Sequence, residues 1–241
     1  MTVSQKIENQ LVEIPVGTPF RYQDLGIKDT EYSAAASAMS RLVGAGILSR
    51  VSKGVFYKPK KTVFGIAKPK EEDLLKEYLF KNGQRIAYVT GMNLYNKMGL
   101  TTQVPAQIFV ATKSRRSAVT LGNITIRPTK SYAAITNDNF PLLGILDAIK
   151  DFNDIPDKNT RSAIQVLTGR IKKLSSQELK ELMYYAAKYP PRVSAFLGAL
   201  LENADNRFDL KSLRKNISPL SKYRFGVTDI ELATASKWNI K

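Results

Sequence analysis

The sequence predicts an α+β fold, and three observations lead to that prediction. Between residues 29 and 59, a segment with an apolar stripe at helical spacing is followed at once by two short β-rich runs. Between residues 85 and 127, further β-rich runs alternate with turn residues. From about residue 140 onward, apolar residues recur at helical spacing. We therefore expect an N-terminal helix and hairpin, a central mixed α/β segment with antiparallel strands, and a helical C-terminal part.

The bulk composition is typical of an ordinary folded protein. The 241 residues are 43% hydrophobic and 24% charged, and no apolar run approaches the ~20 residues that a membrane span needs. The first residues lack the basic and apolar regions of a secretion signal, and the chain contains no cysteine. We expect a cytoplasmic protein without a membrane partner. Its predicted domains cover residues 1–62 and 63–241, the second being mixed α/β over 70–130 and mainly helical over 140–241.

Positive charge is the strongest global signal in the composition. The formal net charge is +16 and the pI is near 9.9. Residues 1–65 contribute +4, residues 66–130 contribute +7 and residues 131–241 contribute +5, so the charge does not come from one basic tail. A polyanion such as DNA or RNA is the natural partner of such a chain. The alternative is a solubility charge on all faces, because a sequence does not show clustering in space.

The absence of both His and Cys removes several kinds of chemistry. A Ser-His-Asp or Cys-His nucleophile pair, a thiolate zinc site and an imidazole proton shuttle all need one of these residues. We therefore expect no enzyme, no cofactor and no metal site. One enzymatic alternative stays open: Asp157 after a proline, followed later by Glu178 and Lys180, superficially matches the metal-binding pattern of restriction-type nucleases. A helix-capping role explains Glu178 more simply.

The first 60 residues predict a succession of short elements. An amphipathic helix over residues 3–14 is followed by a brief extended piece at 17–21 and one or two helical turns at 22–26. A longer helix follows, with Asp29 as its N-cap, and then a hairpin formed by residues 47–51 and 55–58. Helix, short strand, short helix, longer helix and hairpin is the order of a winged helix-turn-helix, which places its third helix in the DNA major groove. The alternative is a buried Ala-rich helix with an incidental hairpin.

The longer helix and the hairpin supply the predicted DNA-binding residues. Ala35, Met39, Leu42 and Val43 form the stripe that faces the core. The opposite face is expected to contact base edges in the groove, through Ser33, Ser37, Ser40 and Arg41. The hairpin and the residues after it are expected to bind phosphates, through Arg50, Lys53, Lys58, Lys60 and Lys61. Solvated charge at the edge of a hairpin is the alternative for each lysine.

The remaining elements follow from turn residues and periodicity. Residues 58–69 are expected to be a linker, because prolines and lysines surround a central glycine. A helix after residue 70, an extended piece at 85–90 and a helix at 92–98 precede β-runs at 107–111, 118–121 and 124–127. The first two runs are separated by a second basic tip with Lys113, Arg115 and Arg116, which is either another phosphate-binding site or an ordinary charged hairpin end. Further helices are expected at 141–152, 159–174, 177–189, 193–203 and 229–238, the third of them opened by a capping box of Ser175 and Glu178.

Three passages occur in order along the chain: SRLVGAGILSRVSKGVFYKP, then AYVTGMNLYNKMGLTTQVPAQIFVAT running into RRSAVTLGNITIRP, and finally YPPRVSAFLGALLE. Together they resemble the AbiEi-like family of antitoxins and transcriptional regulators. The resemblance implies the antitoxin of a bacterial type IV abortive-infection (phage defence) toxin–antitoxin pair. Its winged helix would repress the pair's own promoter by binding inverted repeats in double-stranded DNA. Its second domain would oppose a nucleotidyltransferase-like toxin without a stable complex. An RNA-binding module and a protein that sequesters its toxin by tight binding remain alternatives.

Overall fold

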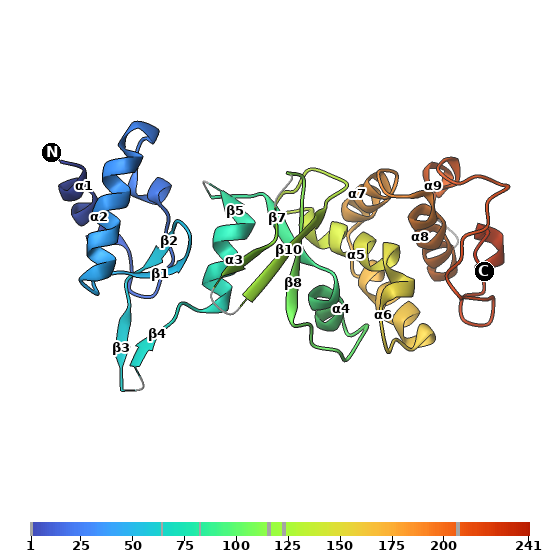
Figure 1. Ribbon diagram of the computed structural model, residues 1–241. Helices are drawn as coiled ribbons and strands as arrows, with labels where there is room; N and C mark the ends of the chain where they lie inside the picture. Colours follow the sequence, from blue (N-terminus) through green and yellow to red (C-terminus); the bar gives the residue numbers. More distant parts are fainter. Residues whose placement is uncertain (1, 64, 82, 115–116, 122–123, 206–207) are drawn as a thin grey trace. The chain divides into compact units, whose positions relative to one another are not determined.

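The structure is a computed structural model that describes residues 2–63, 65–81, 83–114, 117–121, 124–205 and 208–241. Figure 1 labels its helices and strands. Contacts divide the chain into two compact units. Unit 1 comprises residues 1–83 and 118–126, and unit 2 comprises residues 84–117 and 127–241. The predicted boundary after residue 62 falls inside unit 1. Helices, antiparallel strands and a helical C-terminal part are all present, which confirms the predicted α+β class.

Unit 1 begins with the elements that the sequence predicts, in the predicted order. They are α1 (Val3–Glu13), an isolated bridge at Phe20, η1 (Tyr22–Leu25), η2 (Asp29–Glu31), α2 (Tyr32–Gly44), β1 (Ser49–Ser52) and β2 (Val55–Tyr57). Phe20 pairs with Phe56 through two backbone hydrogen bonds of 2.8 and 2.9 Å, which ties the extended piece to β2. The apolar sides of these elements close one core, formed by Ile7, Leu11, Phe20, Leu25, Ile27, Ala35, Ala38, Met39, Leu48 and Phe56.

The start of α2 differs from the expectation. Asp29 does not cap the helix, which begins at Tyr32 without a side-chain cap. A short 3₁₀ turn precedes it, because the Glu31 carboxylate accepts the backbone N–H of Lys28 at 2.9 Å and pairs with the Lys6 ammonium at 3.2 Å. The hydrogen bond from the Lys28 backbone and the contact with Lys6 hold the pKa of Glu31 below its usual value. The entry to α2 is therefore set by Glu31 and α1.

The predicted linker over residues 58–69 contains paired strands, which the sequence analysis did not predict. β3 (Lys60–Thr62) and β4 (Gly65–Ala67) form an antiparallel two-stranded sheet, with Lys60 opposite Ala67 and Thr62 opposite Gly65. The Thr62 hydroxyl donates to the Gly65 carbonyl at 2.8 Å across the end of this hairpin. The chain continues into α3 (Glu71–Leu79) and two short strands, β5 (Phe80–Lys81) and β6 (Gln84–Arg85).

A four-stranded sheet follows, with β7 (Ala87–Thr90), β8 (Gln107–Thr112), β9 (Val119–Leu121) and β10 (Ile124–Lys130) in the order β7-β8-β10-β9. Helix α4 (Met92–Met98) lies between β7 and β8 in the chain, as predicted. The order corrects one expectation: β8 has β10, not β9, as its second neighbour. Lys113 therefore lies in a connection between two strands that are not adjacent, rather than at the end of a hairpin.

Most of the predicted C-terminal helices are present. They are α5 (Phe140–Lys150) with η3 (Phe152–Asp154) after it, α6 (Thr160–Lys172), α7 (Ser176–Ala186) and α8 (Pro191–Ala204). The structure also contains α9 (Lys211–Lys215), which was not predicted, and the short η4 (Ser236–Trp238). The capping box of Ser175 and Glu178 is confirmed. The helix predicted at 229–238 is wrong: only its last three residues are helical. Asp229 accepts the backbone N–H of Ser236 at 2.8 Å, and this bond closes a loop in place of a helix.

Helix α8 is the centre of the core of unit 2. Residues Val193 to Leu201 are all buried, and Trp238 lies against this helix at Gly198. The indole Nε1–H of Trp238 donates to the Glu202 carboxylate at 2.7 Å, and the Arg214 guanidinium lies 3.7 Å from the centre of the Trp238 rings. In the part of the chain that the structure describes, no helix is both long and apolar enough to cross a membrane.

Candidate functional site

Helix α2 of unit 1 presents the face on which the sequence analysis places groove contacts. Ser33, Ser37, Ser40 and Arg41 are all exposed, and so are Ala34, Ala36 and Gly44 on the same helix. The stripe predicted to face the core does so, with Ala35 and Met39 buried and Leu42 and Val43 packed against the same cluster. Apart from Arg41, the exposed face therefore consists of small side chains. A helix with such a face allows another molecule to approach its backbone closely.

The polar groups of this face make only surface contacts. The Arg41 Nη2 donates to the Ser4 hydroxyl near the start of α1 at 3.1 Å, and the Ser37 hydroxyl donates to the Ser33 carbonyl at 3.2 Å. An exposed hydrogen bond of this kind contributes little net stability, because water or a ligand replaces either partner. The Arg41 guanidinium can therefore exchange its bond to Ser4 for a bond to a bound anion or base.

The β1–β2 hairpin begins five residues after α2 ends, and two predicted phosphate-binding residues lie on it. Lys53 is exposed at the tip, next to Gly54, whose φ of 76° lies in the left-handed region that favours glycine. Arg50 is also exposed, and its guanidinium lies 5.3 Å from the centre of the Phe56 ring. Stacking on an aromatic ring restricts the guanidinium without using its hydrogen-bond donors.

The other predicted phosphate-binding residues are placed less uniformly. The Lys58 ammonium donates to the Leu11 carbonyl at the end of α1 at 2.5 Å, so this lysine caps that helix and is not part of the candidate interface. Lys60 is exposed on β3. The side chain of Lys61 is outside the described part of the structure, as are Arg115 and Arg116. Lys113 is exposed in unit 2, so the structure describes one member of the second basic tip.

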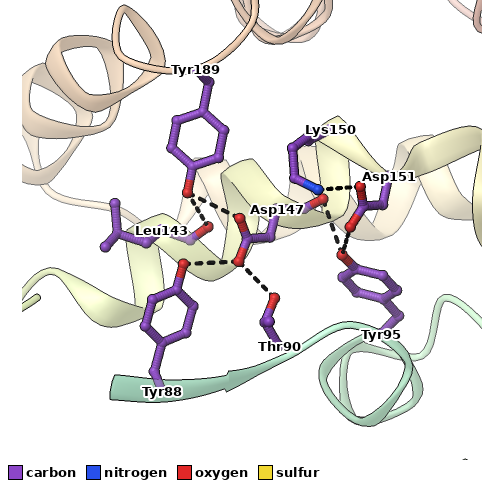
Figure 2. Close-up of polar contacts among 8 residues, drawn as sticks. All are labelled: Tyr88, Thr90, Tyr95, Leu143, Asp147, Lys150, Asp151 and Tyr189. Atoms are coloured by element: carbon purple, nitrogen blue, oxygen red, sulfur yellow. Dashed lines mark hydrogen bonds and ion pairs between the residues drawn. The ribbon is translucent and has the colours of Figure 1, made fainter. Parts of the chain in front are cut away.

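A second polar cluster was missed by the sequence analysis: it surrounds Asp147 in unit 2. Figure 2 shows the Asp147 side chain between three hydroxyl groups, two from β7 and one from the connection between α7 and α8. Oδ2 accepts from Tyr88 at 2.8 Å and from Thr90 at 2.6 Å, both on β7, and Oδ1 accepts from Tyr189 at 3.0 Å. The Tyr95 hydroxyl of α4 donates to the Asp147 carbonyl at 3.1 Å and to Asp151 Oδ2 at 2.7 Å. Asp151 also pairs with Lys150.

Burial determines the electrostatics of this cluster. Asp147 is 3% exposed, and removal from water raises the pKa of its carboxyl group, while the hydrogen bonds from Thr90, Tyr88 and Tyr189 act in the opposite direction. Burial also raises the pKa of Tyr88, Tyr95 and Tyr189, and the nearby carboxylates raise it further. The three phenols are therefore neutral donors at physiological pH. The cluster joins β7, α4, α5 and the end of the α7 region through satisfied hydrogen bonds.

A cavity of about 300 Å³ opens beside Asp147, and it lies within unit 2. It is lined by Thr90, Gly91, Met92, Tyr95, Phe109, Thr129, Lys130, Asp147, Lys150, Asp151 and Asp154. Its volume is at the small end of the range for ligand pockets. Its charges are mixed, with lysines and aspartates facing the same space. One signal in the sequence could have identified the cluster: Asp147 is a single acidic residue inside the apolar run FPLLGILDAIK.

The nuclease alternative gains no geometric support. Glu178 Oε2 accepts from both the backbone N–H and the hydroxyl of Ser175, each at 2.7 Å, as the capping interpretation predicts. The Asp157 carboxylate accepts a hydrogen bond from the side-chain amide of Gln103 at 2.8 Å, and Gln103 is not part of the nuclease pattern. Among the described residues, no group of three or more His, Cys, Asp or Glu side chains is arranged to hold a metal ion.

Comparison with known proteins places the fold and the family. The chain is similar to the crystal structure of the RV2827C protein from Mycobacterium tuberculosis, with a TM-score of 0.53 and 13% sequence identity over 98% of this chain and 89% of that chain. At this identity the likeness concerns the fold alone. No curated protein matches the sequence. A family model described as a family of unknown function, DUF6088, matches residues 6–182. Because this match covers well over half of the chain, the protein belongs to the DUF6088 family.

Proposed function

We propose that the protein is a DNA-binding transcriptional autorepressor and the antitoxin of a type IV abortive-infection toxin–antitoxin pair. One observation carries the DNA-binding part: α2 exposes a face of small residues that ends in Arg41, and the hairpin after it exposes Arg50 and Lys53. A recognition helix needs such a face to approach base edges, and a wing needs cations to bind phosphates. The net charge of +16 also supports DNA as the partner, because positive charge attracts the phosphates of any DNA duplex.

The antitoxin part is supported by the resemblance of three passages to the AbiEi-like family. Its test is co-expression with the neighbouring reading frame, if that frame encodes a nucleotidyltransferase-like protein. We expect the pair to allow growth that the neighbouring protein alone prevents, and we expect the two proteins not to co-purify. Rescue together with a stable complex would instead support an antitoxin that sequesters its toxin. Failure of rescue would contradict the antitoxin part and leave the DNA-binding part standing.

The DNA-binding part is tested by a gel shift with two competitors. The probe is a duplex that carries the region upstream of the protein's own reading frame. We expect an unlabelled copy of this duplex to compete far better than random duplex or single-stranded RNA. Stronger competition by the RNA would favour the RNA-binding alternative, which the diffuse positive charge serves equally well.

Arg41→Ala is expected to weaken binding to the upstream duplex about tenfold or more, because a guanidinium that reads a guanine contributes much of the discrimination at its position. Binding to random duplex should change far less. The measurement is a pair of dissociation constants at one salt concentration. Ser4→Ala is the matched control: it removes the partner of Arg41 in the free protein and should leave both constants unchanged. An equal loss on both duplexes would mean that Arg41 contacts only phosphate.

Lys53→Ala is expected to weaken binding to both duplexes by a similar factor. The slope of log K against log salt should decrease by about one unit, since one phosphate contact is lost. The measurement is a salt titration of each duplex. Lys222→Ala changes the same charge on an exposed side chain of unit 2 and should leave the slope as it is in the unaltered protein. An equal change in both variants would show a response to net charge rather than to a local contact.

A further inference from the structure

The β3–β4 hairpin of unit 1 combines positive charge, part of it from the predicted phosphate-binding residue Lys60, with exposed apolar side chains that have no role in the proposed interface. Residues 58–70 contain five lysines and no acidic residue, so this stretch carries a charge of +5. Near the end of the hairpin, Val63 is 94% exposed and Ile66 is 58% exposed. Single exposed apolar residues are common on protein surfaces. Two of them on one short hairpin, with lysines on β3 before them and Lys68 directly after β4, are a more specific arrangement.

The base of this hairpin is fixed to the rest of unit 1. The Lys58 ammonium donates to the Leu11 carbonyl, and the Lys58 carbonyl accepts the backbone N–H of Gly17 at 2.9 Å. Both contacts hold the chain immediately before β3. The strands themselves pair only with each other in the described structure, and the Thr62 hydroxyl closes the end of the hairpin onto Gly65. The apolar side chains are therefore presented on a structured hairpin with an anchored base.

We propose that the β3–β4 hairpin is a second DNA-contacting element, whose exposed Val63 and Ile66 side chains enter the minor groove while the neighbouring lysines bind the flanking phosphates. Proteins that bind the minor groove insert apolar side chains against the bases and use cations beside them. The charge of +5 is complementary to a polyanion. It disfavours a second copy of this chain as the occupant, because the same lysines would face each other. Val63 and Ile66 have no polar group to read the donor and acceptor pattern of the major groove. This inference rests on the proposed DNA binding.

The test uses the full chain with Val63→Ser and Ile66→Ser combined, which changes the apolar surface and no charge. We expect about tenfold weaker binding to the upstream duplex. The slope of log K against log salt should stay unchanged, in contrast to Lys53→Ala. Netropsin, which occupies the minor groove, should weaken binding of the unaltered protein and have little effect on the double variant. Val104→Ser is the matched control, because Val104 is an 86% exposed valine in unit 2; it should bind as the unaltered protein does.

Each outcome decides between the two proposals. Normal binding by the double variant, together with weaker binding by Lys53→Ala, would overturn the role of the hairpin and leave the proposed function intact. Equal sensitivity of the double variant and the unaltered protein to netropsin would also overturn it. A shift of the double variant to a smaller assembly in sedimentation, with unchanged binding per protomer, would identify a second copy as the occupant. If the unaltered protein bound no duplex, the proposed function and this inference would fail together.

Discussion

Gly198→Ala is expected to prevent unit 2 from reaching its native packing. A Cβ atom at position 198 would lie 2.2 Å from two carbons of the Trp238 ring, far inside the contact distance of two carbon atoms that are not bonded to each other. Trp238 is fully buried and its indole donates to Glu202, so a shift of the ring would disturb this bond and the surrounding core. Overpacking of a core typically costs 1–3 kcal/mol, and this contact is closer than most, so we expect a loss of about 3 kcal/mol or more.

Thermal or urea unfolding, with tryptophan fluorescence as the signal, measures this loss, because Trp238 is the single tryptophan in the sequence. Gly169→Ala is the matched control. Gly169 lies within α6, and a Cβ there would meet no atom within 4 Å. Alanine is the better helix former, so this control should be neutral or more stable by about 0.5–1 kcal/mol. If the two variants unfolded alike, Trp238 would not pack against α8 as described.

Asp147→Ala is expected to have a second large effect on the stability of unit 2. The substitution leaves the buried hydroxyls of Tyr88 and Thr90 without their acceptor, whereas the buried Tyr189 hydroxyl keeps the Leu143 carbonyl at 3.3 Å. A buried polar group left without a partner costs about 1–3 kcal/mol, so we expect a combined loss of about 3 kcal/mol or more. Asp154→Ala is the control: this residue lines the same cavity but is exposed, and its loss should change the free energy of unfolding very little.

Asp147→Asn adds a measurement that depends on pH. The folded protein holds the Asp147 proton to a higher pH than the unfolded chain does, because burial raises the pKa of this carboxyl group. As pH rises from about 4 through the folded pKa, the unfolded state therefore gains relative to the folded state. The unaltered protein should lose stability relative to Asp147→Asn over this window, and the difference should be constant above it. A difference that moved in the opposite direction would mean that the three hydroxyl donors outweigh burial.

Local features of the fold could be predicted from the sequence, because they depend on residues a few positions apart. The stripe with Ala35 and Met39, the β1–β2 hairpin and the capping box of Ser175 and Glu178 are all of this kind, and the structure contains each. The exposed face of α2 follows from the same periodicity. Its binding to DNA stays a prediction.

Distant pairings explain what the sequence did not show. The hydroxyls on Asp147 come from residues 42, 57 and 59 positions away, so no local pattern connects them. The pairing of β8 with β10 rather than β9 is a choice between two strands of similar composition. The failed helix at 229–238 has helical periodicity, but the bond from Ser236 to Asp229 and the packing of Trp238 prevail over it. Tertiary contacts decided each of these cases.

The division of the chain into units affects the order in which the protein can be completed during synthesis. Unit 1 is built from residues 1–83 and 118–126, so β9 leaves the ribosome only after residues 84–117 have been made. The core around Ile7, Met39 and Phe56 needs none of the later residues and can close early. The remainder of unit 1 must wait for β9. A nascent chain or a fragment that ends near residue 83 would therefore contain the α2 face without the strand that completes its unit.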